Sequence, residues 1–568
     1  MLKGIPVSEG YAVARVLKIE EVQIDYRKVT VDNPLEEISI FRQAIDQTVT
    51  QLEQLKSETE KKFDHETSKI FEAQLMIATD PEVNDAVESK IRAESCNLVY
   101  AIKYVVDRFV DLFDHLDDEY LKDRAFDLRD VTNRTIKNAL NIEIVDLSHI
   151  NEKVILLTTE LTPSQTAQID PNFVCGFVTE IGGKTSHSAI IARLLQIPAI
   201  VGVEHLMQKL KNHQEIILDG FHGEIITDFD DKIKQDYQNK IERYEKKKSA
   251  LKTMIGKQSQ SKDGHVYELF GNIASSKDIN HIINFDADGI GLYRTEFLFL
   301  DHLVLPTEDE QFEEYKKVLE SVYPKPVVIR TLDIGGDKHL PYLNLEKELN
   351  PFLGKRAIRL SFDHIDVFKT QLRALLRASA YGHLKIMFPM IAVKEEFIKA
   401  KAIVEEVKQA LRKEKTKVAD FELGIMIEIP SAALMADQLA QVVDFISIGT
   451  NDLIQYTMAA DRTHQSLTYL YQPLNPAILK LIDMVAQAGK KHQIKVSVCG
   501  EMASDIYAGP LLLGLGVEEL SMTPSHILKI RKILSKLNHS DLEKLSKSVL
   551  KLDNEEQVLS ELKKLIKV

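Results

Sequence analysis

The C-terminal part of the sequence repeats one pattern eight times: a short apolar stretch, then a long stretch with helical periodicity. The apolar stretches cover residues 267–273, 289–293, 327–332, 385–390, 423–429, 444–448, 495–499 and 518–522. Strands that alternate with helices form parallel sheets, and eight such units in roughly 300 residues are typical of a TIM barrel. An open, doubly wound sheet is the alternative. We predict an α/β fold with a TIM (β/α)8 barrel over residues 257–568.

The N-terminal part combines strand-like and helical regions. Apolar runs occur within residues 1–20 and return from about residue 145 onward. Between them, residues 33–143 contain no glycine, and apolar residues recur there every three or four positions. We expect an α/β domain built from residues 1–32 and 144–228, with the helical bundle 33–143 inserted into it. The charged stretch 229–256 predicts a helical linker to the barrel.

Composition limits what the chain binds and where it works. Its 568 residues carry a formal net charge of −14 at pH 7, which argues against general nucleic-acid binding. No apolar run approaches the roughly 20 residues of a transmembrane helix, and the first residues lack the apolar core of a signal peptide. Cys96, Cys175 and Cys499 are too scattered for a disulfide framework or a zinc site. We expect a cytoplasmic protein with reduced thiols and no membrane insertion.

Polar residues stand at the ends of the predicted barrel strands. They are Asn272, Arg294, Arg330, Glu428, Asn451, Asp452 and Cys499. The active sites of TIM barrels lie at the carboxyl ends of the strands. Guanidinium groups bind phosphate and carboxylate through paired donors, so Arg294 and Arg330 suit a substrate that carries both groups. Structural salt bridges are the alternative for each arginine.

Glu428 and Asp452 are candidate metal ligands. A carboxylate within an apolar strand, such as Glu428, is costly unless it is paired or binds a metal. Two carboxylates at adjacent strand ends can hold Mg²⁺ and leave positions for substrate oxygens, as at phosphoryl-transfer sites. Pairing with a nearby arginine is the alternative for either carboxylate. Cys499 is either an inert buried thiol or, beside such a site, a group that moves a proton.

The segment Gly182-Gly183-Lys184-Thr185-Ser186-His187 precedes a helical stretch in the N-terminal α/β region. Two glycines permit a tight turn, and Thr185 or Ser186 can cap a helix whose first turn contains His187. Free backbone N–H groups favour an anion there, so His187 is a candidate phosphoryl acceptor; a capping or core histidine is the alternative. A P-loop is excluded because Val178 stands where that motif needs glycine.

Together these residues resemble the Enzyme I family of the bacterial phosphoenolpyruvate:sugar phosphotransferase system, which belongs to the PEP-utilizing enzymes. The segment 182–187 is similar to the family's phosphohistidine motif. The stretch from Ile446 to Arg462, Ile-Ser-Ile-Gly-Thr-Asn-Asp-Leu-Ile-Gln-Tyr-Thr-Met-Ala-Ala-Asp-Arg, is similar to its second signature, and the similarity runs end to end. Two positions depart from the pattern: Lys184 replaces an expected arginine, and Lys355 replaces an expected aromatic residue.

The resemblance implies a phosphoenolpyruvate-protein phosphotransferase. The residues it assigns to phosphoenolpyruvate are Arg294, Arg330, Asn451, Asp452 and Arg462, with Mg²⁺ on Glu428 and Asp452. His187 would take the phosphoryl group and pass it to a histidine of the carrier protein HPr, while Cys499 would protonate the enolate to give pyruvate. The helical insertion would dock HPr through segments that contain Glu66 and Arg124 to Arg129. The barrel would form a homodimer.

Two other functions compete with this interpretation. The pyruvate phosphate dikinase group also combines a mobile histidine domain with a barrel, but it needs an ATP-binding domain, for which no segment before residue 181 is spare. A non-catalytic, phosphate-accepting scaffold would not need Glu428, Asp452 and Cys499. Because His187 and the barrel belong to different domains, we also expect a hinge in the linker 229–256.

Overall fold

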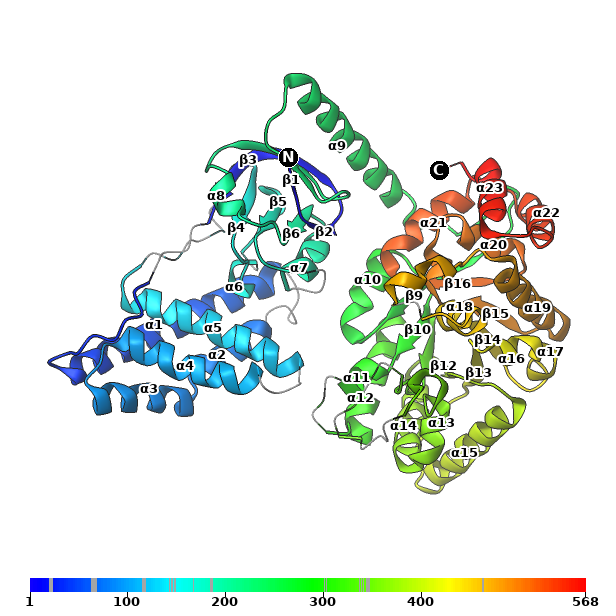
Figure 1. Cartoon of the computed structure of the whole chain (residues 1–568). Coiled ribbons are helices and arrows are strands. Elements are labelled where there is room, and N and C mark those ends of the chain that lie inside the picture. Colours follow the sequence, from blue (N-terminus) through cyan, green and yellow to red (C-terminus); the bar gives the residue numbers. More distant parts are fainter. Residues whose placement is uncertain are drawn as a thin grey trace. The chain divides into compact units, whose positions relative to one another are not determined.

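The computed structural model describes residues 1–19, 24–62, 69–114, 119–142, 144, 147, 150–166, 168–183, 187–300, 302, 304–336, 338, 340, 342–343, 348–461 and 464–567. The chain forms two compact units, Met1–Lys248 and Ser249–Val568 (Figure 1). The first unit contains an open sheet with a group of helices, and the second contains a closed barrel.

The first unit is built on an eight-stranded sheet with the strand order β1-β8-β7-β3-β4-β5-β6-β2. Its strands are β1 (Leu2–Lys3), β2 (Ile5–Ser8), β3 (Tyr11–Lys18), β4 (Val154–Thr158), β5 (Val174–Thr179), β6 (Ala199–Val201), β7 (Glu215–Asp219) and β8 (Glu224–Ile226). Strands β3 to β6 run parallel, and every residue of the central strand β4 is buried, as expected for a strand covered on both faces. Segments on either side of the helical region therefore share one sheet.

The chain between β3 and β4 is mainly helical. In the described ranges they are α1 (Pro34–Lys62), α2 (Lys69–Ala78), α3 (Pro81–Glu94), α4 (Leu98–Asp114) and α5 (Glu119–Ala139). Ile38, Phe41, Ile102 and Val105 are buried in their common core, so the three- and four-residue spacing of these residues marks the faces that pack. The inserted helical bundle that the sequence predicts is confirmed.

The remaining helices of this unit are shorter, except for the last one. They are α6 (Pro163–Thr166), α7 (His187–Leu195), α8 (Leu206–Lys209) and α9 (Asp231–Lys252). Helix α7 follows β5 and buries Ala189 and Ala192 in the same core as Phe177 of that strand. Small residues on this face let the helix lie close to the sheet.

The second unit is a closed barrel of eight parallel strands, β9 to β16, in which β16 pairs with β9 (Figure 1). The strands are β9 (Glu268–Ile273), β10 (Ile290–Arg294), β11 (Pro326–Arg330), β12 (His383–Phe388), β13 (Glu422–Ile427), β14 (Phe445–Ile448), β15 (Lys495–Val498) and β16 (Glu519–Met522). Each predicted strand segment overlaps one of them. Closure confirms the TIM barrel and excludes the open sheet.

Helices surround the barrel strands. They are α10 (Ile279–Asn284), α11 (Glu296–Leu300), α12 (Glu308–Val322), α13 (Ile358–Asp363), α14 (Ile365–Ala378), α15 (Lys394–Lys413), α16 (Pro430–Leu434), α17 (Ala436–Leu439), α18 (Thr450–Met458), α19 (Pro476–His492), α20 (Ala508–Gly514), α21 (Ile527–Leu534), α22 (His539–Val549) and α23 (Glu555–Leu565). Their apolar faces pack on the outside of the strands, as Phe368, Leu372 and Leu375 of α14 show. Across the described residues, no helix combines the length and apolar character that a membrane span requires.

Candidate active site

The predicted barrel residues gather at the carboxyl ends of the strands. Arg294 and Arg330 are the last residues of β10 and β11, while Glu428 and Cys499 directly follow β13 and β15. Asn451 and Asp452 lie in the first turn of α18, just after β14. Arg462 lies outside the described residues. Since parallel strands end at one rim of a barrel, these side chains belong to one mouth.

Arg330 is held in a buried ion network. Its Nη2 donates to Glu296 Oε1 at 2.6 Å, and its Nη1 lies 3.0 Å from Asp333 Oδ2. Both carboxylates are at most 1% exposed, and the Arg330 side chain is 7% exposed. Lys338 Nζ adds a second cation at 2.7 Å from Glu296 Oε1. The guanidinium is therefore fixed in position, although its Nε has no hydrogen-bond partner in the described part of the chain.

Arg356 connects this network to Asp452. Its Nε and Nη2 donate to the two oxygens of Asp333 at 3.0 and 3.2 Å, and its Nη1 and Nη2 donate to the two oxygens of Asp452 at 3.0 and 3.2 Å. Burial alone would raise the pKa of Asp333, but the charges of Arg330 and Arg356 overcome it and hold that pKa below its usual value. A planar fork can bridge two carboxylates in this way, whereas a lysine cannot.

Glu428 has a different electrostatic environment. It is 1% exposed, and Oε1 accepts a hydrogen bond from the Met390 backbone N–H at 2.7 Å. Burial, followed by the charges of Asp452 and Asp333, raises the pKa of Glu428 to about 8. A Cβ on Gly449 would lie 2.8 Å from Glu428 Oε2, so glycine there keeps space for this carboxylate.

These two carboxylates fit a divalent cation. Burial and the charges of Asp452 and Asp333 raise the pKa of Glu428, and a bound cation would favour its ionised form. Within the described ranges, no cluster of three or more His, Cys, Asp or Glu side chains could hold a metal. Mg²⁺ commonly takes one or two carboxylates and completes its shell with water and phosphate oxygens. Asp452 would then be shared with Arg356.

Cys499 lies in the apolar interior of the barrel. It is 4% exposed and packs in a cluster with Met387, Met426 and Phe445. Burial raises the pKa of the Cys499 thiol to about 11, although Ser447 and the charge of Arg330 act in the opposite direction. The thiol is therefore neutral at physiological pH and carries a proton.

Asparagine side chains tie neighbouring strand ends together. Asn451 Oδ1 accepts from the Glu501 N–H at 3.0 Å, and Asn451 Nδ2 donates to Glu501 Oε1 at 3.2 Å. Asn272 Nδ2 donates to the carbonyl of Cys499 at 3.1 Å. A Cβ on Gly500 would lie 1.9 Å from Thr450 Oγ1, so only glycine allows this close approach. These contacts fix the loops that carry Cys499 and Asp452.

His187 belongs to the first unit, where it is the first residue of α7. The preceding turn contains Gly182 with φ +132°, a conformation that favours glycine. Lys184, Thr185 and Ser186 lie outside the described residues. The other departure, Lys355, places its Nζ 2.9 Å from Asp363 Oδ2. His187 and the barrel residues stand on separate units.

Glu296 and Asp333 were not among the residues predicted for the site. Each lies within three residues of a predicted arginine, in the segments Arg294-Thr-Glu296 and Arg330-Thr-Leu-Asp333. That spacing was a usable signal, because a buried arginine at a strand end needs carboxylate partners. Arg356 stood in the sequence as one of several arginines. Only the structure shows that it bridges two aspartates.

The barrel mouth thus combines fixed cations, the carboxyl groups of Glu428 and Asp452, and a neutral thiol. Models of the PEP-utilising enzymes match the chain in three parts: the N-terminal domain at residues 3–124, the mobile domain at 150–223 and the PEP-binding domain at 248–539. The phosphoenolpyruvate-protein phosphotransferase of Bacillus subtilis (strain 168) is 47% identical over 567 residues, 100% of both chains. That of Priestia megaterium is 45% identical over 559 residues, 98% of both chains. A solution NMR structure of an Enzyme I protein is 39% identical, covers 43% of this chain and 100% of its own, and has a TM-score of 0.40. The chain therefore belongs to the PEP-utilising enzyme family, in the group of the phosphoenolpyruvate-protein phosphotransferases.

Proposed function

We propose that this chain transfers the phosphoryl group of phosphoenolpyruvate to His187 and then to a histidine of HPr, releasing pyruvate. It is thus the general phosphotransferase of a sugar phosphotransferase system. The observation that carries this proposal is the 47% identity to a phosphoenolpyruvate-protein phosphotransferase over the full length of both chains. Relatives that align from end to end share every domain that the reaction needs.

Phosphoenolpyruvate would bind at the mouth of the barrel. Arg294, Arg330 and Arg462 would contact its phosphate and carboxylate, and Asn451 would contribute its amide. The fixed position of Arg330 supports this assignment, because a guanidinium already held by Glu296 and Asp333 loses little freedom when substrate binds. The unpartnered Nε of Arg330 also leaves a donor for an anion within the described network.

A divalent metal ion, which we propose to be Mg²⁺, would be held by Glu428 and Asp452. When bound, it would neutralise charge on the phosphate oxygens. The chain's own contribution is to place Glu428 within electrostatic reach of Asp452 and to exclude a side chain at Gly449. Glu428 would lose its proton when the cation binds, because opposite charge favours the ionised form.

The neutral imidazole of His187 supplies the nucleophile. A ring nitrogen forms a bond to phosphorus, the P–O bond to the enol oxygen breaks, and its electron pair stays on the enolate. The enolate carbon then takes a proton from the Cys499 thiol, which gives pyruvate and a thiolate. Ser447 and Arg330 lower the pKa of Cys499 and so stabilise that thiolate. The thiol regains its proton from solvent before the next cycle.

His187 must travel between the two phosphoryl partners, and the contacts of α9 limit where the chain pivots. Tyr237 donates to Asp219 at 3.2 Å, and the Tyr244 ring lies 5.6 Å from that of Phe221, so this part of α9 belongs to the first unit. The Met254 carbonyl accepts from Arg531 at 2.9 Å within the second unit. We therefore place the hinge between residues 245 and 253.

The helical insertion would dock HPr. Met76 of α2 is 70% exposed, a large apolar side chain that suits a protein interface. Of the residues expected to contact HPr, Arg124 and Arg129 lie on α5, whereas Glu66 lies outside the described residues. The proposed organisation therefore has four parts: the mobile α/β domain, the inserted helical domain that docks HPr, the helical linker, and the PEP-binding barrel.

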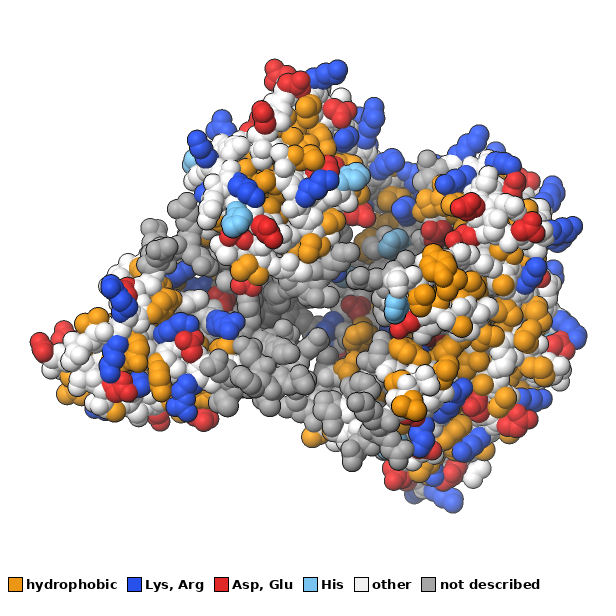
Figure 2. All heavy atoms as spheres, in the orientation of Figure 1, with side chains coloured by type: hydrophobic (Ala, Val, Ile, Leu, Met, Phe, Trp, Pro, Cys, Tyr) orange, Lys and Arg blue, Asp and Glu red, His pale blue; other side chains and the backbone are white. Residues whose placement is uncertain are grey.

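A homodimer would form through the barrel unit. Figure 2 shows hydrophobic side chains gathered on the side of the barrel unit that carries α16 and α19. Leu434, Met435 and Met484 there are 58%, 48% and 42% exposed, and α16 packs against α19. Exposed apolar side chains that cluster in this way suit an interface between subunits.

A cytoplasmic location stays a prediction. All three cysteines are free thiols, which is consistent with a reducing compartment.

Pyruvate release tests the proposed function. With phosphoenolpyruvate, Mg²⁺ and HPr, but without ATP, we expect steady pyruvate formation in a lactate dehydrogenase assay. Omitting HPr should limit the yield to about one pyruvate per chain, because His187 then keeps its phosphoryl group. His187→Ala should abolish both the steady pyruvate formation seen with HPr and the single-turnover yield seen without it. His222→Ala, in the same unit, should abolish neither. Turnover by the His187 variant would refute the proposal.

A further inference from the structure

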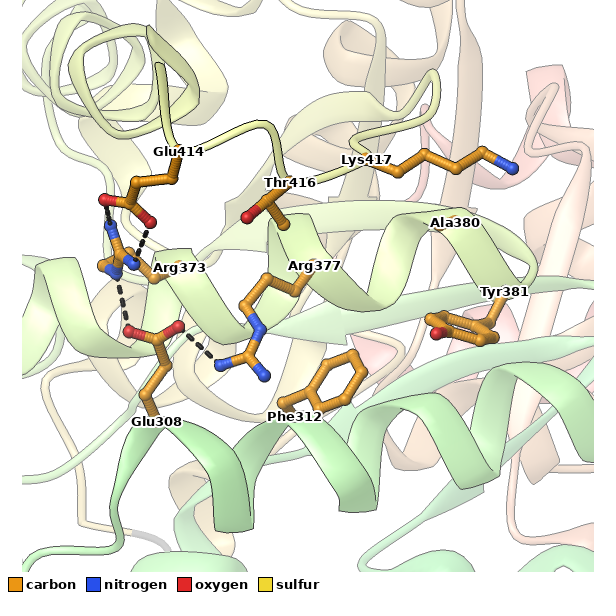
Figure 3. A pocket seen from close by; sticks show the side chains of 9 residues that line it. All are labelled: Glu308, Phe312, Arg373, Arg377, Ala380, Tyr381, Glu414, Thr416 and Lys417. Atoms are coloured by element: carbon orange, nitrogen blue, oxygen red, sulfur yellow. Dashed lines mark hydrogen bonds and ion pairs between the residues drawn. The ribbon is translucent and has the colours of Figure 1, made fainter. Parts of the chain in front are cut away.

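A second pocket lies on the outer surface of the barrel unit, away from the strand ends that carry the candidate active site. Its volume is about 520 Å³, and it is formed by α12, the end of α14, and the segments that precede β12 and β13. Its lining residues, drawn in Figure 3, are Glu308, Phe312, Arg373, Arg377, Ala380, Tyr381, Glu414, Thr416 and Lys417. A cavity of this size can hold a ligand of nucleotide dimensions.

The two arginines of the pocket have different roles. Arg373 uses all three of its nitrogens: Nε donates to Glu308 at 2.6 Å, and Nη1 and Nη2 donate to Glu414 at 3.0 and 2.8 Å. Arg377 uses only Nη1, which lies 2.6 Å from Glu308 and 2.7 Å from Asp309. Arg373 therefore has a structural role, whereas Arg377 keeps Nε and Nη2 without a carboxylate partner in the described chain.

Further polar groups of the pocket also lack partners. Lys417 is exposed and makes no ion pair with any residue that the structure describes. Lys417 and the two arginines face the carboxylates of Glu308 and Glu414, and Asp309, which lies 2.7 Å from Arg377, balances the third cation. Both arginines are thus engaged by carboxylates, whereas the Lys417 ammonium is not. A small anion would be attracted to this pocket by Lys417.

Aromatic rings form one wall of the pocket. Tyr381 is 38% exposed, and its ring centroid lies 5.9 Å from that of Phe312. Arg377 lies over the Phe312 ring at 4.3 Å, which holds the guanidinium beside the apolar wall. Figure 3 shows Tyr381 beyond Phe312, with Lys417 and Thr416 on the facing segment. A ligand ring could pack against Tyr381 while its charged group reaches Arg377 and Lys417.

We propose that this pocket binds an organic monophosphate that carries a planar ring. Arg377, Lys417 and the Thr416 hydroxyl would contact the phosphate oxygens, and Tyr381 would contact the ring. A phosphate is favoured over a carboxylate because three separate donors match its three oxygens. This site is distinct from the proposed phosphotransfer site, and its test does not depend on that reaction.

The test is isothermal titration calorimetry of the full-length protein, which gives the dissociation constants of adenosine 5′-monophosphate, adenosine and inorganic phosphate. We expect the monophosphate to bind more tightly than either fragment. Arg377→Ala should weaken its binding by about tenfold or more, since a hydrogen bond to a charged group is lost. Lys417→Ala should weaken it to a smaller extent. Tyr381→Ala should weaken binding of the monophosphate but not of inorganic phosphate. The matched control is Arg412→Ala, an exposed arginine of α15 outside the pocket, which should bind like the parent chain.

Two results would overturn the proposal. Equal affinities for the monophosphate and for inorganic phosphate would show that the aromatic wall takes no part. Unchanged monophosphate binding by both Arg377→Ala and Lys417→Ala would place the ligand elsewhere, including at the mouth of the barrel. Circular dichroism of each variant shows whether the fold is kept. If Arg377→Ala unfolds, the exposed Lys417 and Tyr381 variants decide the outcome.

Discussion

Glu519, at the start of β16, should make the stability of the barrel depend on pH. Its side chain is 5% exposed, and Oε1 has no hydrogen-bond partner among the described residues. A Cβ on Gly291 would lie 3.0 Å from that oxygen, so the carboxyl group occupies the space that this glycine leaves. Burial raises the pKa of Glu519 from 4.5 to about 8, and the folded protein holds a proton there near neutral pH.

The sign of the effect follows from proton binding. Between pH 4.5 and pH 8 the folded state binds more protons at Glu519 than the unfolded state, so the free energy of unfolding falls as the pH rises. The stabilisation from the protonated carboxyl group is fully present below pH 4.5, the unfolded-state pKa. It is lost progressively as the pH rises to about 8, the folded-state pKa. One pKa unit corresponds to about 1.4 kcal/mol, which makes the whole change on the order of 5 kcal/mol.

Glu519→Gln should remove this dependence, because glutamine is neutral at every pH. The chain contains no tryptophan, so unfolding is best followed by scanning calorimetry and far-ultraviolet circular dichroism. At pH 5.5, one unit above the unfolded-state value of 4.5, the variant should be more stable than the parent chain by only about 1.4 kcal/mol. At pH 8.5 its barrel transition should lie several degrees higher, at about 2 °C per kcal/mol. The exposed Glu556→Gln serves as the control. If the difference between Glu519→Gln and the parent is the same at both pH values, the burial argument is wrong.

Three further predictions concern the barrel mouth. Arg356→Lys keeps the charge but loses the fork that joins two aspartates, so it should lower the free energy of unfolding by about 2–4 kcal/mol in urea titrations; an unchanged midpoint would contradict the bridging role. Gly449→Ala should displace the Glu428 carboxyl group, lower kcat at least about tenfold and reduce the free energy of unfolding by about 1–3 kcal/mol. Full activity would show that Glu428 does not need the space that Gly449 leaves. Cys499→Ala should slow pyruvate formation by about 10²–10⁴-fold while the circular dichroism spectrum stays the same; normal turnover would return Cys499 to a packing role.

Much of the barrel could be predicted because its signals are local. Strand-forming apolar runs recur between amphipathic helices, and residues at the strand ends must share one rim once the sheet closes. The sequence alone therefore predicts that Arg330, Glu428 and Cys499 lie at the same mouth. The order of the strands followed from chain connectivity, since each helix returns the chain to the neighbouring strand.

The pairing of charges could not be predicted in the same way. Arg356 reaches Asp452 across 96 positions of sequence, and nothing local distinguishes it from Arg359, which donates to the backbone carbonyls of Leu353 and Gly354. The buried Glu296 begins an apolar stretch, Phe-Leu-Phe-Leu, and resembles an ordinary first-turn acid of a helix. Which side chains form ion pairs depends on their proximity in the folded structure and on their burial. The spacing of residues in the sequence does not reveal either.

The position of the phosphoryl group tests the central claim most directly. The chain is incubated with Mg²⁺ and phosphoenolpyruvate labelled on phosphorus, without ATP, and the labelled peptide is identified by mass spectrometry under alkaline conditions that preserve phosphohistidine. We predict a single labelled site at His187, removed by His187→Ala and discharged when HPr is added. Label that stays on the His187 variant, or that HPr does not remove, would contradict the proposed function.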